Sequence, residues 1–379
     1  MIVPCMGPPL VDNVLPNTSP VVIVGAGPAG LGLSRQLARR NVPHVLLEAG
    51  RAGASWRAMP PALKLVSPWW TNVLARRDVF RHFPFAMVGA EHYARYLARF
   101  RHRYRLNVTE HCEVLAISRE GTSGWFRVET SRGCVAARMV VCATGYFTRP
   151  ADPTPSYADD GSIPIMHAAR YPGPEQTRAI AGDAPVVIVG RRISAGQLMV
   201  ELHRHGVPVV LSTRAPLEFR RDGVFGAFKD FLYYFYEELL IRLKPRLQAP
   251  SFPVMDGGHS RHIVEAGHIP LRGTIRNIQG GEIEFDDGTT LRAGLVINAT
   301  GYRPALPPLR EIAVFRDEAG LPACHDWESA DTPELFFLGL DNRVNYRSRT
   351  IRGIRRDASL LASLIERRLR SFSSQPPRA

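Results

Sequence analysis

A length of 379 residues, with 45% hydrophobic and 22% charged residues, indicates a globular protein of two or three domains and argues against a disordered chain. The net charge of +13 comes almost entirely from arginine and could attract an anionic ligand, but no basic segment alternates with aromatic residues, so no nucleic-acid partner is expected. The five cysteines are irregularly spaced and include no Cys-x-x-Cys pair, which argues against a disulfide framework. The sequence shows no apolar leader and no apolar run of about 18 residues, so neither a secretion signal nor a membrane span is predicted. A cytoplasmic location is therefore expected.

The first ordered segment predicted is a dinucleotide-binding turn. Residues 20–49 read PVVIVGAGPAGLGLSRQLARRNVPHVLLEA, which predicts a buried strand over 21–24, a helix over 31–40 and a second strand over 45–47. In the G-x-G-x-x-G turn between them, the first glycine permits the bend, the second leaves room for a pyrophosphate and the third lets helix and strand pack closely. An acid ends the second strand, where it can accept hydrogen bonds from a ribose. The predicted site consists of Gly25, Gly27, Pro28, Ala29, Gly30, Glu48 and Ala49.

A second strand, turn and helix are predicted within residues 186–199, which read VVIVGRRISAGQLM. Gly190, Ser194 and Ala195 fit the first, fifth and sixth positions of a dinucleotide turn. Arg192, however, stands where the middle glycine belongs, and a side chain there conflicts with the close approach of a pyrophosphate.

The strand expected after this helix, over 207–211, leads to Ser212 and Arg214. The acid that would repel a 2′-phosphate is therefore absent, and an arginine that could bind one is present. Two interpretations stay open: the turn binds NADPH with Arg191 or Arg192 pairing with a displaced pyrophosphate, or it has lost its nucleotide.

Residues 224–243, VFGAFKDFLYYFYEELLIRL, predict an amphipathic helix. Its apolar face is expected to hold Phe225, Phe228, Leu232, Phe235 and Leu239. The helix either packs on the second nucleotide domain or forms a lid or entrance for a large apolar substrate. Downstream, His259 and His262 form H-x-x-H without further ligands, so they are expected in a loop and no metal site is predicted.

Several further segments complete a recognisable order. They are GASW at 53–56, VVCATG at 140–145, LVINATGY at 295–302, LFFLGL at 335–340, a loop with six arginines over 343–356 and a helix expected over 357–369. With GAGPAG at 25–30, this order resembles the class B flavin-dependent monooxygenases, which include flavin-containing monooxygenases, plant indole-pyruvate monooxygenases and Baeyer–Villiger enzymes. The likeness covers roughly residues 20–370. In GSIPIMHAARY, however, only His167 and Tyr171 match the family's F-x-G-x-x-x-H-x-x-x-Y/F motif, so no subclass is assigned.

The resemblance implies an α/β fold with two Rossmann-like dinucleotide-binding domains, the NADPH-binding domain being inserted into the FAD-binding domain. After a flexible tail over 1–16, the FAD domain is expected over 17–155 and 306–379, and the NADPH domain over 156–305, joined by proline-rich crossings. The further residues that this implies near FAD are Trp56, Arg57, Thr71, Asn72, Thr144, Gly145, Thr300, Gly301 and Asp341. Those implied near NADPH are Gly190, Arg191, Arg192, Ser194, Ala195, Ser212 and Arg214.

Residues 65–85 also resemble a family segment in which a Thr-Asn pair precedes Phe-Pro. There the asparagine lies over the flavin, beside the carbon that carries the peroxide, and a neutral amide can donate and accept hydrogen bonds in a site closed to water. Asn72 is therefore the predicted catalytic residue, unless it merely caps a helix or turn. Trp56, Trp69 and Trp70 either wall the flavin and substrate or serve ordinary packing. One or two of the arginines in 343–356 are expected near flavin, nicotinamide or an acidic substrate, and the others in solvent.

The expected activity is an FAD-dependent, NADPH-consuming monooxygenation. One oxygen atom of O2 would pass through a flavin hydroperoxide to a small organic molecule, for which an apolar or aromatic one is favoured. The alternatives are an oxidase or dehydrogenase whose second site no longer uses NADPH, a disulfide reductase, which would need a redox cysteine pair, and a flavin-binding sensor. The sequence assigns neither the substrate nor the oligomeric state.

Overall fold

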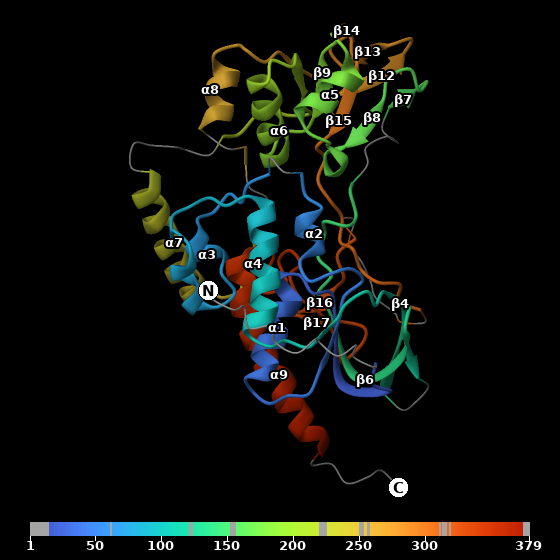
Figure 1. Cartoon of the computed structure of the whole chain (residues 1–379), viewed down its shortest axis with the longest axis vertical. Helices are drawn as coiled ribbons and strands as arrows, with labels where there is room; N and C mark the ends of the chain where they lie inside the picture. The colour runs from blue at the N-terminus through green and yellow to red at the C-terminus, as the bar shows by residue number, and fades with distance from the viewer. Residues whose placement is uncertain are drawn as a thin grey trace, which may run out of the picture.

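The protein forms two lobes in a computed structural model, with the larger lobe drawn below the smaller one in Figure 1. The structure describes residues 15–60, 63–120, 124–151, 157–219, 226–249, 254–255, 258–310, 312, 317 and 320–373. Most of the tail expected over 1–16 lies outside these residues. Across the described part of the chain, no helix is long and apolar enough to cross a membrane.

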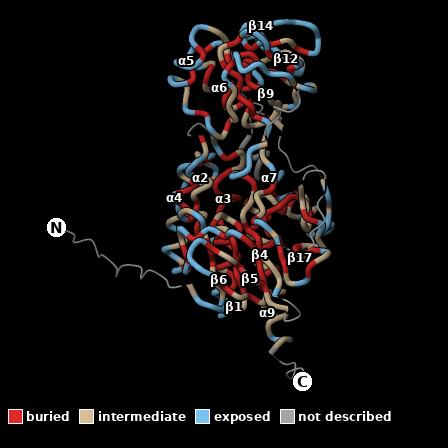
Figure 2. Tube along the Cα trace, turned by 90° about the vertical axis from the view of Figure 1, so that its right-hand side faces the viewer, coloured by how far each residue is buried: buried red, intermediate tan, exposed pale blue. Residues whose placement is uncertain are grey.

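The larger lobe is built on a nine-stranded sheet whose centre runs β18-β6-β1-β2-β3 with all strands parallel. Its strands are β1 (Thr18–Val24), β2 (Val45–Leu47), β3 (Val108–Thr109), β4 (Val114–Glu120), β5 (Trp125–Thr130), β6 (Gly133–Cys142), β16 (Cys324–His325), β17 (Glu328–Ser329) and β18 (Leu335–Phe337). Its helices are α1 (Pro28–Ala38), α2 (Ala54–Arg57), α3 (Trp69–Asn72), η1 (Arg76–Arg81), α4 (Ala90–Arg103) and α9 (Ile351–Ser373). Apolar residues of β1, α1, α4 and α9 share one buried core (Figure 2).

The smaller lobe holds a five-stranded, fully parallel sheet in the order β11-β10-β9-β15-β8 and a separate four-stranded sheet, β14-β13-β12-β7. The strands are β7 (Ala158–Asp159), β8 (Ile165–His167), β9 (Val186–Val189), β10 (Val209–Ser212), β11 (Leu271–Arg272), β12 (Ile275–Gln279), β13 (Glu282–Phe285), β14 (Thr290–Arg292) and β15 (Leu295–Asn298). The helical segments here are η3 (Ala168–Arg170), α5 (Pro174–Ala181), α6 (Ile193–Arg204) and α8 (His259–Glu265). The predicted α/β class with two Rossmann-like units is confirmed.

The first and the last passages of the chain between the lobes are hydrogen-bonded to each other. Ala151 N donates to Gly301 O over 2.9 Å, and Arg303 N donates to Arg149 O over 2.9 Å. Pro150 and Tyr302 pair as an antiparallel bridge. We call residues 149–151 and 301–303 the paired crossing, because they form one two-stranded ribbon.

The helix α7 (Gly226–Leu243) corrects two expectations. It packs on the larger lobe, not on the smaller one: the Tyr234 ring lies 5.6 Å from the Trp70 ring in an edge-on contact (Figure 1). Its buried face consists of Tyr234, Glu237 and Ile241, whereas Leu232, Phe235 and Leu239 are exposed. Phe225 lies outside the described residues, as does the side chain of Phe228. The helical period predicts an amphipathic helix, but it does not reveal that a buried carboxylate selects the packed face.

Glu237 of α7 sits at the centre of a buried ionic cluster. Its carboxylate accepts two hydrogen bonds of 2.6 Å from Arg352 and one of 2.8 Å from the Tyr346 hydroxyl. Arg347, whose side chain is 3% exposed, lies 3.6 Å from the same carboxylate. Burial lowers the pKa of the Arg352 guanidinium, but the contact with Glu237 outweighs this and the net shift is upward. These contacts fasten α7 to the loop and first turn of α9.

The arginine-rich loop is another correction. The expectation that most of its six arginines lie in solvent is wrong, since all of them are buried or half-buried. Carboxylates account for several: Glu237 and Glu238 of α7 hold Arg347, and Asp341, just before the loop, holds Arg349 at 3.1 Å. Two boundaries also differ, because the last helix begins at Ile351 instead of 357, and His259 and His262 lie in α8 rather than in a loop.

Candidate active site

A cavity of about 1870 Å³ lies between the lobes, at the carboxyl ends of β1, β2 and β6. The ends of parallel strands are where ligands bind in open α/β sheets. From the smaller lobe, α6 presents one face to it, made of Ile193, Ser194, Gln197, Val200, Glu201 and Arg204. The Gln197 amide exchanges two hydrogen bonds, of 3.0 and 3.1 Å, with the backbone of Lys64 in the larger lobe, so the two walls are in direct contact.

The three glycines of the first turn occupy different environments. A Cβ on Gly25 would lie 2.9 Å from Ala143 O, and one on Gly30 would lie 1.9 Å from Gly25 O, so both positions exclude a side chain. A Cβ on Gly27 would have no described atom within 4 Å. Gly27 precedes α1 and lines the cavity, so the open space lies where a phosphate would meet the helix N-terminus.

Glu48 follows β2 and lines the same end of the cavity. One carboxylate oxygen accepts a hydrogen bond of 2.6 Å from Ala26 N, and the other accepts one of 3.0 Å from Gly50 N. The carboxylate therefore fixes the glycine turn, and each oxygen keeps acceptor capacity for a ligand hydroxyl. Its predicted contact with a ribose stays a prediction.

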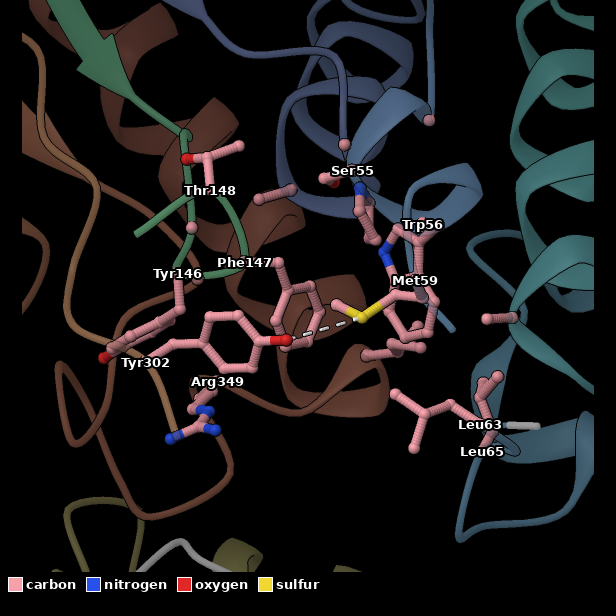
Figure 3. Close-up of a pocket in the computed structure, with 18 of the residues that line it drawn as sticks. Ser55, Trp56, Met59, Leu63, Leu65, Tyr146, Phe147, Thr148, Tyr302 and Arg349 are labelled. Atoms are coloured by element: carbon pink, nitrogen blue, oxygen red, sulfur yellow. Dashed lines mark hydrogen bonds between the residues drawn. The ribbon is translucent and has the colours of Figure 1, made fainter. Parts of the chain in front are cut away.

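Aromatic side chains form a wall across the cavity (Figure 3). The Phe147 ring lies 5.4 Å from the rings of Trp56 and Tyr302, and the Tyr302 hydroxyl donates to the Met59 sulfur at 4.0 Å. Trp56 comes from the GASW segment, Phe147 follows the first Ala-Thr-Gly turn and Tyr302 follows the second. Residues distant in the chain thus meet in one apolar surface suited to a planar ring. Of the other tryptophans, Trp69 is 2% exposed in the core.

Behind this wall, a polar group holds Arg349 at the cavity. Asp341 is buried and receives hydrogen bonds of 3.1 Å from the Tyr146 hydroxyl and from Arg349. The Arg349 guanidinium also lies 4.6 Å from the centre of the Tyr146 ring. Burial, together with Asp341, raises the pKa of Tyr146. Tyr146 and Arg349 line the cavity, whereas Asp341 orients both from behind it.

Asn72 lies at the cavity but uses its amide locally. The amide nitrogen donates to Ser67 O at 2.7 Å and to Pro68 O at 3.2 Å, and the amide oxygen accepts from the Ser67 hydroxyl at 2.9 Å. These bonds match the turn-holding interpretation and leave one oxygen lone pair for a ligand. Thr71 is fully buried and donates to Pro68 O, so it does not reach the cavity.

The second turn repeats the backbone of the first. Arg192 precedes α6 as Gly27 precedes α1, and both have extended backbones, with φ of −119° and −79°. An arginine is therefore compatible with the turn itself. A Cβ on Gly190 would lie 2.7 Å from Ala299 O, so glycine is needed there.

Positive charge gathers at this turn. Burial and three neighbouring guanidinium groups lower the pKa of Arg192; they belong to Arg191, Arg214 and Arg349. Glu218, 3.6 Å from Arg191, only partly offsets the positive potential. Such a concentration of guanidinium groups at a helix N-terminus suits an anion. Ser212, by contrast, donates its hydroxyl to Gly273 O at 2.7 Å.

Several predicted residues line the cavity, namely Gly25, Gly27, Pro28, Ala29, Glu48, Ala49, Trp56, Asn72, Thr144, Gly145 and Ser194. The other predicted residues do not line it: Gly30, Arg57, Thr71, Gly190, Arg191, Arg192, Ala195, Ser212, Arg214, Thr300, Gly301 and Asp341. Met59, Tyr146 and Phe147 line it without having been predicted. The signal for the last two was their position directly after Thr144-Gly145. Among the described residues, no cluster of metal-ligating side chains occurs.

The fold and the cavity define a flavoprotein oxidoreductase with the build of the flavin-containing monooxygenases. Residues 22–224 match the family model described as pyridine nucleotide-disulphide oxidoreductase, and the chain belongs to that family. A CzcO-like oxidoreductase of Geobacillus kaustophilus is 27% identical over 348 residues, covering 90% of this chain and 96% of its own. The probable indole-3-pyruvate monooxygenase YUCCA4 of Arabidopsis thaliana is 24% identical, covering 79% and 80%. The flavin-containing monooxygenase of Stenotrophomonas maltophilia superposes with a TM-score of 0.74 at 22% identity, covering 93% of this chain and all of the other.

Proposed function

We propose that the protein is an FAD-dependent monooxygenase that takes electrons from NADPH and oxidises a small organic substrate. The observation that carries this is one cavity that reaches both dinucleotide turns: it includes the open slot at Gly27 and, at the second turn, Ser194, two residues after the basic Arg192. Its volume exceeds the roughly 300–1,000 Å³ of a site for one small molecule, so a dinucleotide and a substrate fit together.

The residues present suit FAD at the first turn. Gly27 leaves space for the pyrophosphate, the α1 N-terminus faces it, and Glu48 offers acceptors to the ribose. When bound, the flavin would accept a hydride and activate O2. The chain's own part is to orient the flavin against the substrate and to exclude water with the wall of Trp56, Phe147 and Tyr302.

An FAD-dependent oxidase is the competing function, favoured by Arg192 in place of glycine. Disulfide reduction through a Cys-x-x-Cys pair is not supported, since the sequence contains no such pair. The deciding experiment mixes purified protein anaerobically with NADPH, with NADH or with neither, and follows loss of the visible flavin absorption. Loss of the flavin absorption with NADPH supports the monooxygenase. If neither nucleotide reduces the flavin, the oxidase is the better-supported function.

Arg214 is expected to select NADPH over NADH. Its side chain is exposed, and its positive charge is close enough to Arg192 to lower the pKa of that residue. It can form a charge-assisted hydrogen bond with a 2′-phosphate. Arg214→Ala should raise the NADPH concentration for half-maximal flavin reduction about tenfold or more, with little change for NADH. Arg276→Ala, an exposed arginine of the same lobe, serves as the control. Equal effects on both nucleotides would contradict the role.

Asn72 is expected to keep NADPH oxidation coupled to oxygenation of the substrate. Asn72→Ala should retain FAD but release more hydrogen peroxide per NADPH oxidised, because the amide can hold oxygen species beside the flavin. Ser67→Ala is the matched control, since it removes one turn bond and keeps the amide. An unchanged ratio of product to NADPH in Asn72→Ala refutes the role. Equal uncoupling by Ser67→Ala means that Asn72 acts only through the turn.

A further inference from the structure

Exposed apolar side chains are concentrated on one face of the larger lobe. Fourteen large hydrophobic side chains among the described residues are strongly exposed, and ten of them lie in just two segments, 80–87 and 232–243. We call these ten the apolar face: Phe80, Phe83, Phe85, Met87, Leu232, Tyr233, Phe235, Tyr236, Leu239 and Leu243. Phe80 is 87% exposed and Leu243 is 73% exposed, so the face is not the edge of the core. Contiguous exposed apolar surface of this kind marks an interaction site.

The two segments lie side by side, held by Trp70. Its backbone N–H donates to Pro84 O at 3.0 Å, and its ring packs edge-on against Tyr234 at 5.6 Å. Figure 1 shows α7 beside α3, the helix that carries Trp70. The Glu237 cluster fixes α7 from behind, which leaves its aromatic side pointing outward.

Basic side chains surround the apolar face. Those exposed along its two segments are Arg76, Arg77, Arg81, Arg242, Lys244 and Arg246. Acids offset part of this charge, since Arg81 lies 3.5 Å from Asp78, Arg242 lies 3.7 Å from Glu238 and Arg246 lies 3.1 Å from Asp326. Asp78 and Glu238 are also paired with Arg103 at 2.7 Å and Arg347 at 2.9 Å, so the balance along these segments stays positive. Aromatic and aliphatic side chains within a basic rim are the composition of surfaces that lie in the interface of an anionic bilayer.

Charge also argues against a second copy of this chain as the occupant. A symmetric pairing of this face would bring the two basic rims together, and like charges across an interface oppose association. An anionic lipid surface satisfies both the apolar centre and the basic rim.

We propose that the apolar face docks onto anionic membrane surfaces, with Phe80, Phe83 and Phe235 inserted among the lipids. Met87 and Tyr233 belong to the face and also line the cavity. An apolar substrate dissolved in the bilayer therefore has a direct entry into the cavity beneath the docked face. That substrate route rests on the proposed function, whereas docking itself requires neither NADPH nor catalysis.

The test is sedimentation of the full-length, flavin-loaded protein with vesicles. One set is phosphatidylcholine alone and the other contains about 30% phosphatidylserine, without NADPH or substrate. We expect binding to the anionic vesicles, weak binding to the neutral ones and release at about 0.5 M salt. Since no catalytic step is involved, failure to bind is distinguishable from failure of the monooxygenase reaction.

Two variants separate the apolar and basic contributions. Phe80→Ser/Phe83→Ser/Phe235→Ser should reduce vesicle affinity at least tenfold, and Arg77→Gln/Arg242→Gln/Lys244→Gln should reduce it by about fivefold per residue. The matched control, Leu115→Ser/Ile180→Ser/Leu271→Ser, removes exposed apolar groups elsewhere and should bind as the parent does. Because the serine variant can fail to fold, Phe83→Trp provides a second measurement: its emission should shift to the blue on anionic vesicles.

Three results would overturn the proposal. The first is no binding to vesicles of either kind. The second is equal loss of binding in the control and the apolar variant. The third is a dimer in solution that the apolar variant dissociates, which would make the face a contact between copies of the chain.

Discussion

Gly27→Val should give a folded but colourless protein. A Cβ on Gly27 meets no described atom within 4 Å, so the chain alone tolerates it, whereas a bound pyrophosphate would overlap a branched side chain in this slot. Overpacking of this kind costs about 3 kcal/mol or more, a loss of at least ~100-fold in flavin affinity. The absorption spectrum of the purified variant and its titration with FAD measure the effect.

Substitutions at two other glycines serve as controls for Gly27→Val. Gly89 also precedes a helix with an extended backbone, and its Cβ would lie 3.9 Å from Leu63 O, so Gly89→Val should stay yellow. Gly30→Val should fail to fold, because its Cβ would lie 1.9 Å from Gly25 O. A yellow Gly27→Val protein with unchanged FAD affinity would remove the first turn from the flavin site.

Glu237→Gln should lower the free energy of unfolding by about 3 kcal/mol. Removing one partner of a buried ion pair leaves the other charge without compensation. Here Arg352 loses its carboxylate, and Arg347 keeps only the more exposed Glu238. In a domain of about 200 residues this corresponds to a fall in Tm of roughly 6–12 °C. Thermal unfolding followed by circular dichroism measures it.

Glu238→Gln is the matched control for this substitution. Glu238 also contacts Arg347, at 2.9 Å, but its side chain is 47% exposed, so its loss should cost less than about 1 kcal/mol. Limited proteolysis adds a local readout, since α7 should be cut sooner in Glu237→Gln alone. Equal shifts in Tm for the two variants would show that burial of Glu237 contributes nothing to the anchoring of α7.

The first dinucleotide turn could be predicted in detail because its constraints are local. The strand, the three glycines and the helix lie within 30 residues of one another. The role of each glycine follows from its position in the turn, which can be read from the sequence. The environments of Gly25, Gly27 and Gly30 agree with the three roles assigned to them. The parallel sheets likewise follow from apolar runs that alternate with helical segments.

The packing of α7 and of the arginine loop could not be predicted, because both depend on contacts between residues more than a hundred positions apart. An apolar stripe normally marks the buried side of a helix, yet in α7 the buried Glu237 meets Arg352, 115 residues later. The catalytic role of Asn72 stays a prediction for a different reason: one amide can hold a turn and face a cavity at once. Side-chain bonding of that kind is decided in three dimensions.

The paired crossing keeps the first and last passages between the lobes adjacent, whereas α7 returns to the larger lobe between them. Just beyond the paired crossing, Ala305 N donates to Gly145 O at 2.8 Å, which closes the larger lobe beneath the insertion. Insertions whose ends are neighbours can be exchanged with little disturbance to their host. The chain is thus modular at the ends of the insertion but not throughout it: a relative's smaller lobe grafted between residues 149 and 303 must retain α7 and Glu237 for the larger lobe to stay unchanged.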